Sequence, residues 1–321
     1  QKLTKIAVEK VSAEEARLMS TGFLFPGQGS QKLGMLADIP EMYMERLENV
    51  TGYRLVDKEE NYQDTVFIQL ALLTKAVFYL DEMEKNGIQP DIAAGHSIGA
   101  FCAAVACRSL RFENAAELVY HRAVLMKEAY PSGYAMGVVV GVTRSEAEEI
   151  VAKTFDPDHP VYLSNENCPM QHTLSGSIEG LSVTLAEAKR HQAQTAKLLK
   201  VPVPSHCLLM NDTVKKFKPY MQSVHLSDAR CLYIKNTDGR ATQDAEEIRK
   251  DLLENLAFPV QWNQMMDLAK ELGMDLTIEF PPGNTLTKLI HTKFGVDKGI
   301  RTINLDQHGI DDATFLYQKW R

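Results

Sequence analysis

Residues 91–107 read DIAAGHSIGAFCAAVAC, and this stretch decides the fold class. A short apolar run leads into Gly-His-Ser-Ile-Gly at 95–99, which has the Gly-x-Ser-x-Gly form of a nucleophile elbow. Small apolar residues follow the motif and can pack as a buried helix. Glycines on both sides of Ser97 suit a tight strand-to-helix turn, where Cβ atoms would not fit. The pattern predicts a strand, a sharp turn and a helix that presents a nucleophilic serine, the alternative being a purely structural Gly-Ser turn.

Composition limits the function classes. The chain has 321 residues, of which 45% are hydrophobic and 24% are charged, a profile typical of soluble globular proteins. A formal net charge of −7 disfavours a general nucleic-acid-binding role. No apolar run is long enough to span a membrane. Five cysteines lie scattered without metal-type spacing, and no signal peptide is evident, so we expect a cytoplasmic protein without a metal site.

The hydrophobic pattern predicts an α/β fold in two parts. A buried strand at 21–25, helices at 66–86 and 112–130, and the elbow between them begin an α/β-hydrolase-like large domain with a parallel sheet core. The pattern of this domain resumes after residue 203, with predicted strands at 232–234 and 276–280 and predicted helices at 243–256 and 261–272.

The intervening residues change character. From 134 to 203 the predicted order is β-α-β-β-α-β, with the last strand over 195–203, which fits an inserted ferredoxin-like subdomain. Its first helix starts with the capping signature Thr143-Arg144-Ser145-Glu146. We therefore expect a large catalytic domain formed by 21–133 and 204–321, a small subdomain at 134–203, and a polar N-terminal extension at 1–20.

A nucleophilic serine needs a base, and one histidine is in a suitable context. His206 lies in Val-Pro-Ser-His-Cys at 203–207, just after a predicted strand and at the return to the large domain. His96 is adjacent to Ser97, but neighbours at a turn point in different directions. His206 is therefore the candidate base, the alternative being a capping or core histidine.

Arg122 is the second unusual residue. It falls on the apolar stripe of the predicted helix at 112–130, where an unpaired buried charge is costly. Its partner is either a carboxylate of the protein or a substrate carboxylate, which a guanidinium binds with two parallel hydrogen bonds.

The loop after the first strand contains Gly27-Gln28-Gly29. The next glycine is Gly34, so the spacing of a dinucleotide-binding loop is absent. Glycines at this strand end can instead turn a backbone N–H toward the elbow, which would supply a second oxyanion donor.

Taken together, these motifs resemble those of the malonyl-CoA:acyl-carrier-protein transacylases. The resemblance covers about residues 21–290 and keeps the motif order of that family. It is carried by FPGQGSQ at 25–31, GHSIG at 95–99, Arg122, and PSHC at 204–207, with further support from 165–171, 259–262 and 279–283.

The resemblance implies roles for single residues. Ser97 would be the acylated nucleophile, and His206 would act first as its base and then as the acid that protonates the leaving thiol. In this family a backbone carbonyl orients the imidazole, and the matching position is Asn255, where many relatives carry Gln. Gln28 and Ile98 would supply the oxyanion-hole N–H groups. Arg122 would bind the free carboxylate of the malonyl group.

The resemblance also implies partners. These are malonyl-CoA and an acidic acyl carrier protein whose phosphopantetheine-type thiol accepts the acyl group, as in fatty acid biosynthesis; no cofactor of the enzyme's own is expected. Ala100-Phe101 and the segment 130–134 look more like the epsilon subunit of malonate decarboxylase, so subunits of that complex are further candidate partners. A basic patch should meet the carrier, and Lys215, Lys216 and Lys218 could form it or be an ordinary solvated helix face.

Two other functions remain open from the sequence. A serine thioesterase or esterase could use the same elbow, since acids such as Asp156 lie between Ser97 and His206 in the chain. A non-catalytic subunit that only binds a carrier protein is the second. Ser205, just before the histidine, leaves the choice between malonyl and methylmalonyl open.

Overall fold

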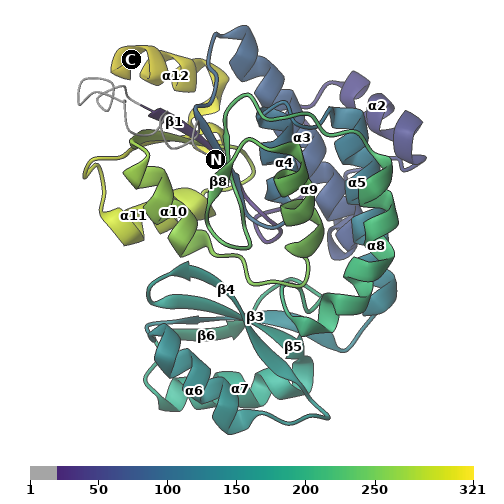
Figure 1. Ribbon diagram of the computed structural model, residues 1–321, viewed down its shortest axis with the longest axis vertical. Helices are drawn as coiled ribbons and strands as arrows, with labels where there is room; N and C mark the ends of the chain where they lie inside the picture. The colour runs from purple at the N-terminus through teal and green to yellow at the C-terminus, as the bar shows by residue number, and fades with distance from the viewer. Residues whose placement is uncertain (1–19) are drawn as a thin grey trace, which may run out of the picture.

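The computed structural model describes residues 20–321 as two sheets with flanking helices (Figure 1). The larger sheet and most of the helices form the upper part of the view, and the smaller sheet lies below them. The predicted extension at 1–20 lies outside the described residues except for Ser20, which begins the first strand.

The larger sheet has six strands in the order β10-β9-β1-β2-β7-β8. All neighbouring pairs are parallel except β7 with β8. This arrangement confirms the predicted parallel core. The strands are β1 (Ser20–Phe25), β2 (Ile92–Gly95), β7 (Leu232–Ile234), β8 (Ala241–Thr242), β9 (Met274–Glu279) and β10 (Arg301–Asn304).

Helices cover the larger sheet. The helices that the sequence predicted begin and end within a few residues of their predicted bounds. None of the helices in residues 20–321 is long and apolar enough to cross a membrane. The helices of this part are α2 (Glu41–Thr51), α3 (Thr65–Lys85), α4 (Gly99–Ala106), α5 (Phe112–Ala129), α8 (Asn211–Ser223), α9 (Ala245–Glu254), α10 (Trp262–Glu271), α11 (Thr285–Phe294) and α12 (Leu305–Trp320), with short 3-10 turns η2 (Glu59–Gln63) and η3 (Leu208–Met210).

The smaller sheet has four antiparallel strands in the order β4-β5-β3-β6. With two helices the chain order is β-α-β-β-α-β, so the ferredoxin-like prediction is confirmed. Thr143 caps the first of these helices by accepting a hydrogen bond from the Glu146 N–H at 3.2 Å. The limits 134–203 of the subdomain stay a prediction. The elements are β3 (Tyr134–Val140), α6 (Arg144–Thr154), β4 (Val161–Cys168), β5 (Gln171–Ser177), α7 (Ile178–Arg190) and β6 (Thr195–Leu198).

One element is shorter than its pattern indicates. The sequence predicts a strand over 195–203, but β6 ends at Leu198. Two prolines, Pro202 and Pro204, follow within six residues and lack the N–H that a sheet ladder needs. The chain beyond β6 instead runs along the cavity described below.

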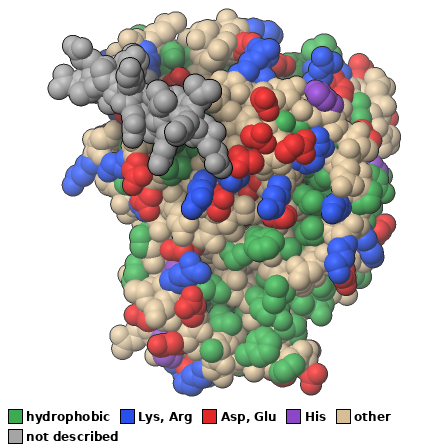
Figure 2. Space-filling view, in the orientation of Figure 1, with side chains coloured by type: hydrophobic (Ala, Val, Ile, Leu, Met, Phe, Trp, Pro, Cys, Tyr) green, Lys and Arg blue, Asp and Glu red, His purple; other side chains and the backbone are tan. Residues whose placement is uncertain are grey.

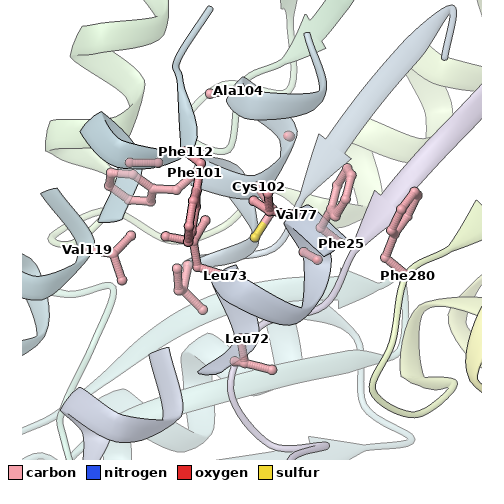
Figure 3. Close-up of a cluster of buried hydrophobic side chains, with 14 of the residues drawn as sticks. Phe25, Leu72, Leu73, Val77, Phe101, Cys102, Ala104, Phe112, Val119 and Phe280 are labelled. Atoms are coloured by element: carbon pink, nitrogen blue, oxygen red, sulfur yellow. The ribbon is translucent and has the colours of Figure 1, made fainter. Parts of the chain in front are cut away.

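The core of the large domain lies beneath the elbow helix. Phe101 and Cys102 of α4 pack with Leu73 and Val77 of α3, and Phe25 packs against Phe280 (Figure 3). These side chains are almost fully buried. The small residues after the elbow let α4 sit in this core, which holds the elbow against the sheet.

Candidate active site

The elbow is built as the sequence predicts. Ser97 lies between β2 and α4 with φ of 59°, a left-handed conformation that non-glycine residues adopt at a cost. A Cβ on Gly95 would lie 1.8 Å from the Gly99 oxygen, and one on Gly99 would lie 2.3 Å from the Phe25 oxygen. Both positions therefore require glycine, and the turn holds the serine at the carboxyl end of a strand that has parallel neighbours on both sides.

His206 reaches Ser97 from the segment that follows the small sheet. Its Nε2 lies 2.8 Å from the Ser97 Oγ. Its Nδ1 lies 2.5 Å from the backbone carbonyl oxygen of Asn255, which can only accept. The proton therefore resides on Nδ1, and the Nε2 lone pair faces the serine hydroxyl. Asp156, the acid considered for a triad, lies instead in the loop between α6 and β4, where it accepts from the Asp158 N–H.

Burial controls the protonation of this histidine. His206 is 2% exposed. Burial, and next the positive charge of Arg122, lower the pKa of His206 to about 3. A neutral imidazole at pH 7 is the form that can accept the serine proton.

Two backbone N–H groups near the serine are candidates for an oxyanion hole. The N–H groups of Ile98 and Gln28 donate to no acceptor among residues 20–321. Both residues line the same cavity as Ser97. A Cβ on Gly27 would lie 2.8 Å from the His96 oxygen, so glycine here lets the loop approach the elbow closely.

Arg122 enters the site from α5 and is 1% exposed. Its Nη2 donates to the Ser97 Oγ at 3.2 Å and to the Asn255 Oδ1 at 3.4 Å. Its Nη1 donates to the Gln69 Oε1 at 2.7 Å. Burial lowers its pKa to about 9, so the guanidinium is charged at pH 7.

The partners of Arg122 are all neutral. Within the described part of the chain, no carboxylate pairs with this guanidinium, and its Nε has no hydrogen-bond partner. Of the two sequence interpretations, the protein carboxylate is therefore absent among residues 20–321. A buried cation without an anion is costly, and an anionic ligand beside Ser97 would remove that cost.

A cavity of about 410 Å³ joins these groups. The small sheet forms one wall, through residues such as Met136, Val138 and Lys197, and the chain after β6 adds Lys200. The elbow, α5 and the loop after β1 supply Ser97, Arg122 and Gln28 to the lining. The site is thus a concave pocket lined by residues of both parts of the fold, a usual position for a small-molecule site.

The structure adds residues that the sequence reasoning missed. Gln69 of α3 and Asn236, which follows β7, contact Arg122 and the elbow respectively. The neighbouring His96 turns away from the serine, and its Nε2 lies 2.8 Å from the Asn167 Oδ1. Amides have no spacing rule that marks them as functional, so only the fold reveals these contacts.

Comparisons with known proteins show the family to which the chain belongs. The acyl transferase domain family matches residues 22–305. The malonyl CoA-acyl carrier protein transacylase of Bacillus subtilis (strain 168) is 31% identical over 293 residues, which cover 88% of this chain and 92% of that protein. The chain belongs to the malonyl-CoA:acyl-carrier-protein transacylase family.

Solved structures of the transacylase family share the fold. The malonyl CoA-acyl carrier protein transacylase of Coxiella burnetii has a TM-score of 0.86 at 30% identity, with 94% of this chain and 98% of that chain covered. A malonyl-transacylase solved in complex with the acyl carrier protein of a type II PKS has a TM-score of 0.86 at 29% identity and covers 94% of this chain and 100% of that one. These relatives are transacylases, and assignment of this family member to the malonate decarboxylase branch stays a prediction.

Proposed function

We propose that the chain transfers a malonyl group from malonyl-CoA to the thiol of an acyl carrier protein through a malonyl-Ser97 intermediate. The observation that carries the proposal is the buried Arg122 guanidinium, 3.2 Å from the nucleophile and paired only with neutral groups among the described residues. In a malonyl group the free carboxylate is two bonds from the carbonyl carbon that reacts. A cation adjacent to the serine is therefore suited to a short dicarboxylic acyl group.

In the first half-reaction, Ser97 attacks the thioester carbonyl. Its proton passes to the His206 Nε2 while the Oγ–C bond forms, and the Asn255 carbonyl holds the resulting imidazolium through Nδ1–H. The tetrahedral oxyanion accepts hydrogen bonds from the Ile98 and Gln28 N–H groups. The C–S bond then breaks, and His206 returns the proton to the CoA sulfur.

The second half-reaction reverses these steps with a new thiol. The carrier thiol gives its proton to His206 and attacks the malonyl-serine carbonyl. The Oγ–C bond breaks, and the proton returns to Ser97. Arg122 keeps the acyl chain in place in both halves through its carboxylate. This route uses the substrates alone, and the absence of a cofactor stays a prediction.

The surface that would meet the carrier protein is expected to carry basic side chains. Lys215, Lys216 and Lys218 lie on α8. Figure 2 shows basic side chains intermixed with acidic ones over the large domain, and hydrophobic side chains gathered over the small subdomain. The basic docking patch and the cytoplasmic location stay predictions.

Intact-protein mass tests the proposal. The wild type is mixed with malonyl-CoA or with acetyl-CoA, and holo acyl carrier protein is then added. We expect a malonyl adduct, a much weaker acetyl adduct, and loss of the malonyl adduct when the carrier is added. Ser97→Ala is the control and should take no acyl group.

Two results would contradict the proposal. Release of CoA without an adduct, and without a carrier, would indicate a thioesterase. No adduct and no CoA release would favour a different acyl group or a non-catalytic subunit.

A further inference from the structure

Asn236 bridges both sides of the nucleophile. Its Oδ1 accepts a hydrogen bond from the Ser97 N–H at 3.0 Å, and its Nδ2 donates to the Gly95 oxygen at 2.7 Å. The two bonds enclose the strained part of the elbow, where Ser97 has φ of 59°. The amide therefore fixes the backbone of the residue whose side chain reacts.

Asn236 is itself held rigidly. It is fully buried, just beyond the end of β7, which is paired with the elbow strand β2. Its N–H donates to the Asp251 carboxylate at 3.0 Å, and its carbonyl accepts from the Gln261 N–H at 2.8 Å. The backbone N–H, the carbonyl and both side-chain polar atoms thus have partners, so the side chain cannot turn without breaking two hydrogen bonds.

Asp251 anchors this arrangement. The buried carboxylate also accepts from the Tyr233 hydroxyl at 2.6 Å and from the Thr237 N–H and hydroxyl at 3.0 and 2.9 Å. A buried carboxylate is tolerated when donors surround it in this way. The chain of contacts runs from α9 through the loop after β7 to the elbow.

The contacts also determine which amides are available to the oxyanion. Because the Ser97 N–H already donates to Asn236, it is not available for the tetrahedral intermediate. The Ile98 N–H follows directly and has no acceptor among the described residues. The Asn236 side chain therefore engages the Ser97 N–H and leaves the Ile98 N–H for the reaction.

We propose that Asn236 is a positioning residue for the acyl transfer: its carboxamide holds Ser97 in the left-handed conformation that aligns the Oγ with His206 and the Ile98 N–H with the oxyanion. This inference rests on the proposed function only for the identity of the substrate. The contacts of Asn236 with the elbow do not depend on that function. The inference predicts that removing the amide slows chemistry more than binding, since displacement of a reacting group by about 1 Å costs about 10²-fold in rate.

The first test compares Asn236→Ala with a matched control. Asn304 is also buried; its Oδ1 accepts from the Gln307 N–H and its Nδ2 donates to the Gly283 oxygen, outside the residues that contact Ser97. We expect Asn236→Ala to lower kcat about 10²-fold with KM for malonyl-CoA changed less than about threefold. Asn304→Ala should lower Tm to a similar extent and keep kcat. Wild-type kcat in Asn236→Ala, or an equal loss in both variants, would overturn the proposal.

Asn236→Asp keeps the volume and the acceptor, and covers the case in which the alanine variant does not fold. Its carboxylate repels the Gly95 oxygen, but its protonated form donates to that oxygen and restores both bonds. The rate of this variant should therefore rise as pH is lowered from 8 to 5.5, unlike that of the wild type. A wild-type rate at pH 8, or a rate that does not rise, would contradict the role of the bridge.

A sulfonyl fluoride separates this inference from the proposed function. The reagent forms an O–S bond to the Ser97 Oγ, the S–F bond breaks, and His206 takes the proton, without any need for a malonyl group. If malonyl-CoA gives no adduct but the wild type is sulfonylated about 10²-fold faster than Asn236→Ala, the proposed function fails and the inference stands. If both proteins are sulfonylated equally fast, the inference fails.

Discussion

Two buried cations, Lys75 on α3 and Arg122 on α5, have opposite surroundings. Lys75 is 5% exposed and Arg122 is 1% exposed. The Lys75 Nζ lies 2.8 Å from the Asp38 carboxylate and also donates to the Met35 carbonyl. Arg122 instead contacts the Gln69 and Asn255 amides and the Ser97 hydroxyl.

The difference shows that burial of a charge does not by itself indicate function. Burial alone would raise the pKa of Asp38, but the hydrogen bonds of Lys75 and Tyr79 and the Lys75 charge keep it below its usual value. That pair is complete and ties α3 to the loop before α2. Around Arg122 no carboxylate of residues 20–321 pairs with the positive charge, which lowers the pKa of the neighbouring His206.

The largest effect is expected for Arg122→Ala. Loss of the buried charge that we propose binds the substrate carboxylate should lower kcat/KM for malonyl-CoA about 10³-fold. Acetyl-CoA carries no carboxylate, so its acylation should change less than about tenfold. Acylation rates measured by intact mass with both thioesters test this. An equal loss for the two substrates would mean that Arg122 does not select the carboxylate.

Gln69→Glu should convert the Arg122 site into one that resembles the Lys75 site. The introduced carboxylate would pair with the guanidinium and compete with malonyl, so kcat/KM for malonyl-CoA should fall about 10²-fold. Tm should not decrease, because the new pair is complete. Gln69→Met removes the acceptor without adding a charge and should cost about tenfold at most. Similar losses in the two variants would argue against competition.

Lys75→Met should affect stability and not selectivity. It removes the cation from Asp38, whose side chain is 44% exposed and can recover water, so the free energy of unfolding should fall by only about 1 to 2 kcal/mol. Denaturant unfolding measures this change. The ratio of malonyl to acetyl transfer should stay at the wild-type value. A changed ratio would mean that Lys75, like Arg122, affects substrate selectivity.

The smallest effect is expected for the dependence of the acylation rate on pH. Because the pKa of His206 is lowered to about 3 from its ordinary 6.5, the base stays neutral and acylation should be nearly constant from pH 8 to 5. Arg122→Ala removes one of the two main causes that lower the pKa of His206. The pH at which the acylation rate falls on the acid side should therefore be higher in this variant. Unchanged profiles would show that burial alone sets the pKa.

The same shift predicts a cost in stability. The unfolded chain binds a proton at His206 below 6.5 and the folded chain does not, so stability is lost as pH falls from 6.5 toward 3. Denaturant unfolding gives the free energy of unfolding at pH 7 and pH 5 for the wild type and for His206→Gln. The wild type should lose more stability between these pH values than the variant, and the difference is the cost of His206.

Much of the fold followed from local patterns. The elbow, the long helices near it and the β-α-β-β-α-β insert were predictable because turn glycines, apolar periodicity and caps act within a few residues. The strands β8 and β10 and the helices α2, α11 and α12 were not predicted, since their stability depends on neighbours elsewhere in the chain. The early end of β6 has a local reason that the sequence already contained, because Pro202 and Pro204 follow the strand.

The sequence by itself determined the reactive types: a serine in an elbow, a histidine after a strand and an arginine on an apolar stripe. Only the tertiary structure decided their partners. The Gln69 amide is 53 residues from Arg122, the Asn255 side chain is 133 residues from it, and the Asn236 amide is 139 residues from Ser97. Amides and backbone carbonyls occur throughout any chain. They gain a role here because α3, the end of α9 and the loop after β7 place them against Arg122 and Ser97, where burial gives each hydrogen bond and each unpaired charge a large free energy.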